Sequence, residues 1–171
     1  MSQAGEEGTL RAASEQARQV IGLLVTRGRT LAVAESLTGG MLAAALTAIP
    51  GASAVFRGGI VAYATDLKAA LLDVPTDLLA RHGAVHPDVA AAMAAGARAR
   101  MGAAVGAATT GVAGPDPSDG QPVGTVYIAV SAGRDSSVRA LALTGDRHRI
   151  RVATVGHALR LLMGTLMEDN G

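Results

Sequence analysis

The stretch that most constrains the fold is residues 31–40, with the sequence LAVAESLTGG. Its apolar first half predicts a short buried strand, and its last three residues predict a turn into the helix-forming residues 41–49. A helix start offers free backbone N–H groups and a partial positive charge, which suits a binding or catalytic site. The other interpretation, in which the glycines only form the corner between strand and helix, stays open on this stretch alone.

The rest of the chain alternates between helical and strand patterns. Apolar residues from Leu10 to Val25 have helical spacing, and Gly28 stands where a helix ends. Further helices are expected at 65–72, 76–82, 87–100 and 147–166, and further strands at 59–64, 103–110, 124–130 and 138–143. The order predicts an α/β fold: a three-layer α/β/α sandwich on a mixed, mainly parallel sheet. We expect one domain over residues 9–168, preceded by a flexible segment at residues 1–8.

Polar residues follow three of the predicted strands. Glu35 and Ser36 end the first, Tyr63 ends the second with Lys68 just beyond, and Thr109-Thr110-Gly111 end the third. Ligands of such sheets bind beyond the carboxyl ends of the parallel strands. We therefore expect these three strand ends to meet at one site.

Lys68 is conspicuous because the chain has fourteen arginines and this single lysine. Arginine cannot be deprotonated in a protein, whereas a desolvated lysine can act as a base. Lys68 is therefore a candidate for chemistry that arginine cannot perform. An ordinary place on a helix surface is the alternative.

A serine and a lysine without an obvious histidine partner suggest a Ser–Lys nucleophile pair. Desolvation lowers the pKa of a buried lysine, which can then take the proton of Ser36. The backbone N–H groups of Gly39 and Gly40 could stabilise an oxyanion, and Tyr63 could relay a proton or orient Lys68. The separation of Ser36 and Lys68 in sequence gives no distance between them.

Other polar residues near the predicted site have two interpretations each. The segment from Thr110 and Gly111 to Pro115 either holds a substrate or is a flexible corner. Among Arg147, Arg149 and Arg151, one or two could bind a phosphate or carboxylate, while exposure to solvent is the alternative for any single one. Glu35 is expected to orient a neighbour or cap a turn rather than to act as an acid.

Composition excludes several classes of function. The formal net charge is +1, which gives no reason to expect nucleic acid as a partner. The chain has no cysteine, and its four histidines lack the spacing of metal ligands, so we expect neither a metal site nor a cofactor. Residues 1–8 lack the pattern of a signal peptide, and no apolar run is long enough to span a membrane. We expect a cytoplasmic protein.

With these residues in view, the sequence resembles the C-terminal domain of the CinA (competence/damage-inducible protein) family. The matching segments run in family order over nearly the whole chain: 34–40 (AESLTGG), 49–53 (IPGAS), 63–68 (YATDLK), 110–115 (TGVAGP), 122–126 (PVGTV) and 145–147 (GDR), with Arg151. Family members that are defined as enzymes are nicotinamide-nucleotide amidases. The resemblance implies hydrolysis of the carboxamide of nicotinamide mononucleotide to nicotinate mononucleotide and ammonia, in pyridine-nucleotide salvage.

Transferred residue by residue, the resemblance implies that Ser36 is the nucleophile and Lys68 its base, with Tyr63 in support. It implies a substrate pocket and phosphate site formed by Glu35, Thr38, Gly39, Gly40, Thr110 and Gly111 with Arg147 or Arg151. Larger family members carry an additional N-terminal domain, whose activities are not transferred to this chain.

Two other functions remain open. One is a non-catalytic nucleotide-binding or regulatory module linked to competence or DNA damage, and the other is an amidohydrolase acting on a different amide. A small-molecule nucleotide is the expected partner, without nucleic acid or membrane. A homo-oligomer, with a dimer favoured, is compatible with the small side chains of residues 90–99, although packing within one chain could use them equally.

Overall fold

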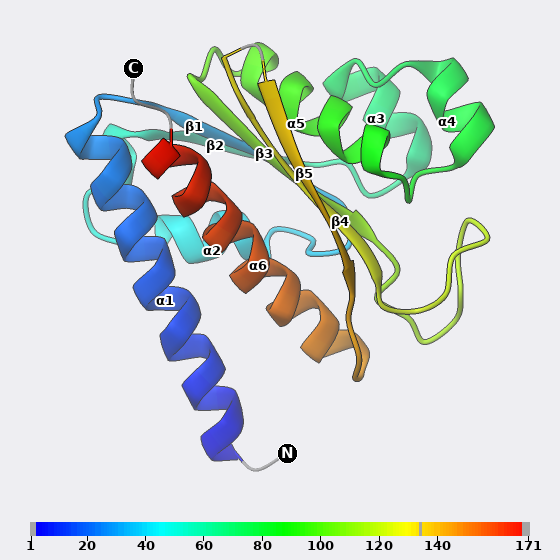
Figure 1. Cartoon of the computed structure of the whole chain (residues 1–171), viewed down its shortest axis with the longest axis horizontal. Helices are drawn as coiled ribbons and strands as arrows, with labels where there is room; N and C mark the ends of the chain where they lie inside the picture. The colour runs from blue at the N-terminus through cyan, green and yellow to red at the C-terminus, as the bar shows by residue number, and fades with distance from the viewer. Residues whose placement is uncertain (1–2, 134, 169–171) are drawn as a thin grey trace.

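The computed structural model describes residues 3–133 and 135–168. These residues form a five-stranded sheet with helices on both faces (Figure 1). The strands are β1 (Leu31–Glu35), β2 (Phe56–Val61), β3 (Val105–Gly111), β4 (Thr125–Ala132) and β5 (Asp135–Ala142). The helices are α1 (Gln3–Thr26), α2 (Met41–Thr47), α3 (Thr65–Leu72), α4 (Thr76–His82), α5 (Pro87–Arg100) and α6 (Arg147–Glu168), with a 3₁₀ turn, η1, at Ala52–Ala54.

The sheet has the order β2-β1-β3-β4-β5. Strand β1 pairs in parallel with β2 and β3, while β4 is antiparallel to both β3 and β5. Four of the five strands therefore run in one direction, and the predicted mixed, mainly parallel sheet is confirmed. The carboxyl ends of β1, β2 and β3 lie at one edge, which is where a ligand site is expected.

The two faces of the sheet are packed with side chains of different size. Figure 1 shows α1, α2 and α6 on one face and α3, α4 and α5 on the other. Leu31 and Val33 of β1 join the core with the leucines and isoleucines of α1 and α6, whereas Ala32 and Ala34 face the alanines of α5. The alternation follows from the period of two along a strand, and it gives the predicted three layers.

On the α5 face, small residues let backbones approach closely. A Cβ atom on Gly106 of β3 would lie 2.0 Å from the Ala94 carbonyl oxygen of α5, and one on Gly96 would lie 1.9 Å from the Leu72 carbonyl oxygen at the end of α3. Ala90, Ala94 and Ala97 are fully buried there. The buried alanines among residues 90–99 therefore pack within this chain, whereas Ala99 is exposed.

Element boundaries differ from prediction mainly at the ends of α1 and at the sheet edges. Helix α1 begins at Gln3 rather than Thr9, so it includes residues 3–8 of the expected flexible segment, and residues 1–2 lie outside the described residues. Strand β2 covers residues 56–61 instead of 59–64, because its pairing with β1 runs from Phe56 opposite Leu31 to Val61 opposite Glu35. Strand β5 begins at Asp135, where it pairs with Ala132, instead of at Val138. None of the described helices is both long and apolar enough to cross a membrane.

Candidate active site

Ser36 is held immediately beyond the end of the central strand β1. Its backbone N–H donates to the Thr109 carbonyl oxygen of β3 at 3.0 Å, and on the other side Ala62 N–H donates to the Glu35 carbonyl oxygen at 2.9 Å. These bonds extend the sheet by one step past Glu35 on both sides. Ser36 is 9% exposed, so its hydroxyl is presented at the sheet edge from a fixed backbone.

Glu35 caps the helix that follows. Its side chain is 1% exposed and accepts hydrogen bonds from the backbone N–H groups of Gly40 (3.0 Å), Leu42 (3.0 Å) and Ala43 (2.8 Å). The carboxylate thereby satisfies the free donors at the start of α2 and meets the positive end of its dipole. Glu35 thus caps α2 and does not line the pocket beside Ser36.

The turn between Glu35 and α2 requires both glycines. Gly39 and Gly40 have φ values of +58° and +96°, a region that side chains rarely adopt. Gly39 N–H donates to the Ser36 carbonyl oxygen at 3.0 Å, and Gly40 N–H is bound by Glu35. The predicted oxyanion donors Gly39 and Gly40 are therefore occupied inside the turn, because the carboxylate of Glu35 replaces any external anion at this helix start.

Lys68 lies within hydrogen-bonding distance of Ser36. Its Nζ is 3.2 Å from Ser36 Oγ, and it also donates to the carbonyl oxygens of Ala62 (2.9 Å) and Tyr63 (3.4 Å). Helix α3 starts just after β2, so Lys68 on its second turn reaches back toward the sheet edge. Two residues far apart in sequence thus form the pair that the residue types suggested.

The environment of Lys68 favours the neutral amine. The residue is 1% exposed, and burial lowers its pKa from the usual 10.5. The negative charges of Asp119 and Asp66 oppose this effect and raise the pKa. A neutral amine has two N–H donors for the two carbonyl oxygens and one lone pair, which is then left for the Ser36 hydroxyl.

Arg147 and Tyr63 form the rim of the site. Arg147 Nη1 donates to the Gly114 carbonyl oxygen at 2.6 Å, and its Nη2 donates to the Tyr63 hydroxyl at 2.7 Å. Tyr63 is 56% exposed. Its backbone carbonyl, not its hydroxyl, contacts Lys68, so the predicted orienting role of Tyr63 is served by the main chain.

Arg151 and Thr38 lie behind the nucleophile instead of in the pocket. Arg151 is one turn beyond Arg147 on α6, and it donates from Nε to the Leu37 carbonyl oxygen (3.0 Å) and from Nη2 to the Thr38 carbonyl oxygen (2.8 Å). Thr38 is fully buried, and its hydroxyl bonds to the Thr109 hydroxyl at 2.7 Å. The structure does not bring either residue to the pocket, because both are used to hold the Ser36 turn.

These segments surround a pocket of about 260 Å³, called here the Ser36 pocket. Its lining combines the predicted site residues with others from the loops around them: Ser36, Leu37, Tyr63, Thr65, Lys68, Ala84, Val85, Thr110, Gly111, Val112, Ala113, Gly114, Asp116, Ser118, Asp119 and Arg147. The predicted residues Glu35, Thr38, Gly39, Gly40 and Arg151 are not part of it.

The connection between α4 and α5 and the loop after Ala113 supply a wall that sequence reasoning missed. Thr110 Oγ1 donates to the Ala84 carbonyl oxygen at 2.7 Å, which ties the end of β3 to this connection. In the sequence, Asp119-Gly120 is a dipeptide typical of a turn. Nothing in the sequence indicated that this turn folds back on residue 84.

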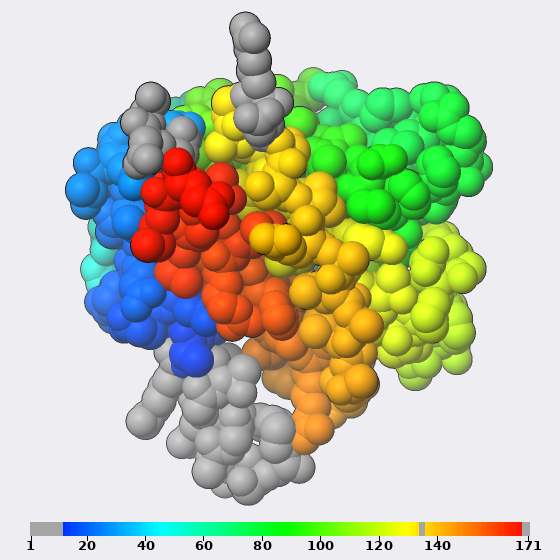
Figure 2. All heavy atoms as spheres, in the orientation of Figure 1, coloured from blue at the N-terminus to red at the C-terminus, as the bar shows by residue number. Residues whose placement is uncertain are grey.

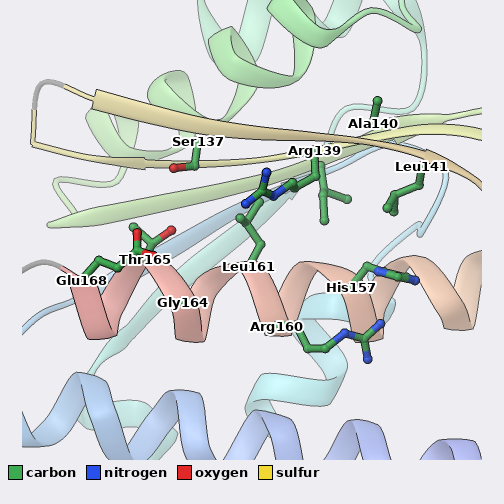
Figure 3. Close-up of a pocket in the computed structure, with 11 residues that line it drawn as sticks. Ser137, Arg139, Ala140, Leu141, His157, Arg160, Leu161, Gly164, Thr165 and Glu168 are labelled. Atoms are coloured by element: carbon green, nitrogen blue, oxygen red, sulfur yellow. The ribbon is translucent and has the colours of Figure 1, made fainter.

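A second pocket of about 300 Å³ lies between β5 and α6 (Figure 3). Arg139 of β5 and His157 and Arg160 of α6 are among its lining residues, and none of the Ser36 pocket residues is. Burial, followed by the charge of Arg160, lowers the pKa of His157. This second pocket has no side-chain pair like Ser36 and Lys68 among its lining residues, so it is not the candidate active site. Within the described residues, no cluster of three or more histidine, aspartate or glutamate side chains could hold a metal ion.

Comparison with known proteins gives a consistent family. The sequence model of the CinA C-terminal domain matches residues 13–166. A CinA-like protein of Frankia casuarinae is 60% identical over 144 residues, which are 84% of this chain and 33% of that protein. A putative competence-damage inducible protein of Desulforamulus reducens is 48% identical over 148 residues, 86% of this chain and 36% of that protein. The chain thus spans about a third of the length of these curated relatives.

Solved structures agree with this result. The competence/damage inducible protein CihA from Agrobacterium tumefaciens superposes with a TM-score of 0.87 at 39% identity, over 92% of this chain and 96% of that one. The competence damage-inducible protein A (ComA) from Klebsiella pneumoniae superposes with a TM-score of 0.89 at 33% identity, over 92% of this chain and 99% of that one. The fold is therefore shared with these proteins over 92% of this chain.

Proposed function

Because this chain belongs to the CinA C-terminal domain family, we propose that it is an amidase that hydrolyses the carboxamide of nicotinamide mononucleotide. The products would be nicotinate mononucleotide and ammonia, in pyridine-nucleotide salvage. The observation that carries the proposal is the 3.2 Å contact between Lys68 Nζ and Ser36 Oγ in a buried position beside a pocket. A nucleophile and a base within hydrogen-bonding reach are the signature of covalent catalysis.

In the first half of the reaction, Ser36 Oγ attacks the carboxamide carbon while neutral Lys68 takes the hydroxyl proton. The tetrahedral intermediate collapses with cleavage of the C–N bond, and the Lys68 ammonium returns the proton to the departing nitrogen, which leaves as ammonia. The bonds from Lys68 Nζ to the Ala62 and Tyr63 carbonyl oxygens hold the amine in line with Ser36 throughout. An acyl-enzyme on Ser36 remains.

In the second half, water attacks the acyl carbon and gives its proton to Lys68. The bond between that carbon and Ser36 Oγ then breaks, and Lys68 returns the proton to the serine. Nicotinate mononucleotide leaves, and both side chains regain their starting protonation states. The mechanism needs one base, which acts in both halves of the reaction.

The Leu37 backbone N–H is our candidate for stabilising the oxyanion. Leu37 lines the Ser36 pocket, and among the described residues its N–H has no hydrogen-bond partner. Its peptide group is fixed because the Ser36 carbonyl oxygen accepts the Gly39 N–H. The N–H of the residue that follows a nucleophile serves this purpose in other hydrolases, and such a donor is worth roughly 10²–10³ in turnover.

Arg147 is the candidate for binding the phosphate. It lines the Ser36 pocket beside the exposed Tyr63, and its guanidinium group has further N–H donors beyond those that bind Gly114 and Tyr63. Arginine binds phosphate through parallel hydrogen bonds. Arg151 is used in the Ser36 turn, so Arg147 is the better candidate of the two that the sequence offered.

The experiment measures ammonia release from nicotinamide mononucleotide by the wild-type protein, Ser36→Ala and Lys68→Arg. We expect release by the wild type and a loss of several orders of magnitude in each variant, because nucleophile and base act as a unit. Lys68→Arg keeps a positive charge and removes the ability to deprotonate. Equal melting temperatures of the three proteins would exclude misfolding as the cause.

Other outcomes favour the other functions. Tight nucleotide binding without ammonia release by the wild type would favour the non-catalytic regulatory module in competence or damage response. Release from a different amide alone would favour an amidohydrolase with another substrate. Activity of Ser36→Ala near the wild-type rate would refute the assignment of the nucleophile.

A further inference from the structure

The connection between α4 and α5 is fastened to the end of β3 and to the β3–β4 loop by two hydrogen bonds of Ala84. Asp119 Oδ2 accepts the Ala84 N–H at 2.9 Å, and Thr110 Oγ1 donates to the Ala84 carbonyl oxygen at 2.7 Å. Ala84 and Val85 line the Ser36 pocket together with Asp119. Both polar groups of one residue in the pocket wall are therefore held by side chains from the end of β3 and from the β3–β4 loop.

Asp119 occupies a constrained position. It stands at the tip of a turn in which Ser118 and Gln121 bond to each other through their backbones, and its own φ is +52°. A Cβ atom on Gly83 would lie 3.0 Å from the Asp119 Cβ, so the connection can approach the turn only because residue 83 is glycine. In Figure 2 the yellow-green atoms of this loop lie against the green atoms of the helical layer that contains α4 and α5.

Asp119 also adds negative charge to a pocket that contains the buried base. The titratable or charged side chains that line this pocket with Lys68 are Tyr63, Asp116, Asp119 and Arg147, and Asp66 lies on the same helix as Lys68. Helix α5 packs against α3. Its charged residues Asp88, Arg98 and Arg100 do not line the pocket, and neither does its N-cap residue, His86. Of the two carboxylates that raise the pKa of Lys68, Asp119 has the larger effect.

We propose that Asp119 is a positioning residue for the Ser36–Lys68 pair, because its carboxylate closes the β3–β4 loop onto the α4–α5 connection and sets the charge facing Lys68 across the pocket. The proposal rests on the proposed function for its catalytic meaning. The hydrogen bond of Asp119 to Ala84 and its effect on the pKa of Lys68 do not depend on that function. They can be tested without a substrate.

The direct test uses the fact that Lys68 is the single lysine of the chain. Protein grown with lysine that carries ¹³C at Cε gives one lysine Cε signal, whose chemical shift against pH reports the titration of Lys68 without any substrate. Asp119→Asn removes the charge but keeps an oxygen that can accept the Ala84 N–H. We expect the titration midpoint to move to lower pH in this variant, because a negative charge that favours the ammonium form is gone.

Asp77→Asn is the matched control. It removes one negative charge from α4 at a surface ion pair with Arg81, whose N···O distance is 2.9 Å. Its midpoint should equal that of the wild type. Asp119→Ala removes both the charge and the acceptor, so its Ala84 amide proton should exchange with solvent faster than that of Asp119→Asn.

Activity adds a third measurement. In Asp119→Ala the KM for nicotinamide mononucleotide should rise, because Ala84 in the pocket wall loses one of the two hydrogen bonds that hold it. The acidic limb of the pH profile should move to lower pH in both variants. An unchanged Lys68 midpoint in Asp119→Asn together with unchanged Ala84 exchange in Asp119→Ala would overturn the proposal. A protein without activity on this substrate would refute the proposed function and leave both spectroscopic results valid.

Discussion

Lys68 is placed so that folding itself favours its neutral form. The amine is buried, its partners at the base of the pocket are two carbonyl oxygens and a hydroxyl, and the carboxylates that favour its charge act from a distance. Burial of an ammonium group costs free energy unless it is paired. The burial that lowers the pKa of Lys68 therefore also makes the stability of the fold depend on pH.

The first prediction concerns this pH dependence. The folded-state pKa of Lys68 lies below its unfolded value of 10.5, so on lowering the pH the unfolded chain binds a proton first. Stability is thereby lost as the pH falls from 10.5 to the folded pKa, and the loss amounts to about 1.4 kcal/mol for every pH unit that separates the two pKa values. Lys68→Met lacks this contribution.

The measurement is urea unfolding of the wild type and Lys68→Met at a series of pH values. The difference in unfolding free energy should change in favour of Lys68→Met as the pH is lowered through this range. Subtracting the two curves removes contributions of the other titrating groups, which both proteins share. A difference that is independent of pH would show that the pKa of Lys68 is the same in both states.

Residue types were a useful signal for the contact between Ser36 and Lys68 and a poor one for its surroundings. A special position for Lys68 could be anticipated because it is the single lysine of an arginine-rich chain. Arg147 and Arg151 could not be distinguished from the sequence, since both follow the same turn. They lie one turn apart on α6, so that Arg147 lines the pocket and Arg151 binds the Ser36 turn. A capping role for Glu35 was expected. The sequence did not indicate that Glu35 would bind the Gly40 N–H, or that the Gly39 N–H would donate to the Ser36 carbonyl oxygen.

At the scale of elements, the height of α3 above the sheet determines where Lys68 lies. The Leu72 carbonyl oxygen, at the end of α3, sits against Gly96 of α5, and α5 in turn sits against Gly106 of β3. No side chain separates these backbones, so α3 has no room to move toward the sheet. Interiors of this density transmit strain instead of absorbing it.

The second prediction is that Gly96→Ala lowers both stability and activity. The added methyl group would lie 1.9 Å from a backbone oxygen, which cannot rotate away, so α3 or α5 must shift. We expect a loss of about 3 kcal/mol in unfolding free energy. Activity of the folded fraction should also fall, because a shift of α3 separates Lys68 from Ser36.

Gly22→Ala provides the control. Gly22 lies within α1, and a Cβ atom there would meet no other atom within 4 Å. The same substitution should leave activity unchanged and raise stability by up to about 1 kcal/mol, because alanine favours a helix interior. The measurements are urea midpoints and initial rates, and equal losses in the two variants would refute the packing argument.

Hydrophobic periods predicted the core elements better than the edges of the sheet. Strands β1 and β3 are buried on both faces and appear in the sequence as apolar runs, so their positions could be predicted. The start of β5 is polar, and it is a strand only because it continues the antiparallel pairing with β4. Such a boundary depends on a partner strand, which a local pattern does not contain.

At the scale of the molecule, the Ser36 pocket is assembled from distant parts of the chain. The turn after β1, helix α3, the α4–α5 connection, the β3–β4 loop and the start of α6 all contribute to it. The rule that ligands bind at the carboxyl ends of parallel strands predicted the turn after β1, helix α3 and the β3–β4 loop. The α4–α5 connection could not be predicted, because it is held at the pocket by hydrogen bonds of the Ala84 backbone.

The third prediction is that a bound nucleotide stabilises the whole fold. A ligand that bridges these segments must dissociate before they separate, so it raises the unfolding free energy by about 2.7 kcal/mol at a concentration 100-fold above Kd. Ser36→Ala, which leaves the substrate intact, should show a raised melting temperature with nicotinamide mononucleotide. The double variant Ser36→Ala/Arg147→Met should show a much smaller increase.

Nicotinamide riboside, which lacks the phosphate, separates the two parts of the ligand. It should stabilise Ser36→Ala less than the mononucleotide does, and it should stabilise both variants to a similar extent. A mononucleotide effect that persists without Arg147 would show that another group holds the phosphate.

The burial of Lys68 also has a practical consequence for handling the protein. Its one side-chain amine is 1% exposed, so common amine-coupling reagents that are too bulky for the pocket find no lysine on the surface. Reagents of this size should therefore leave Lys68 in the Ser36 pocket unmodified.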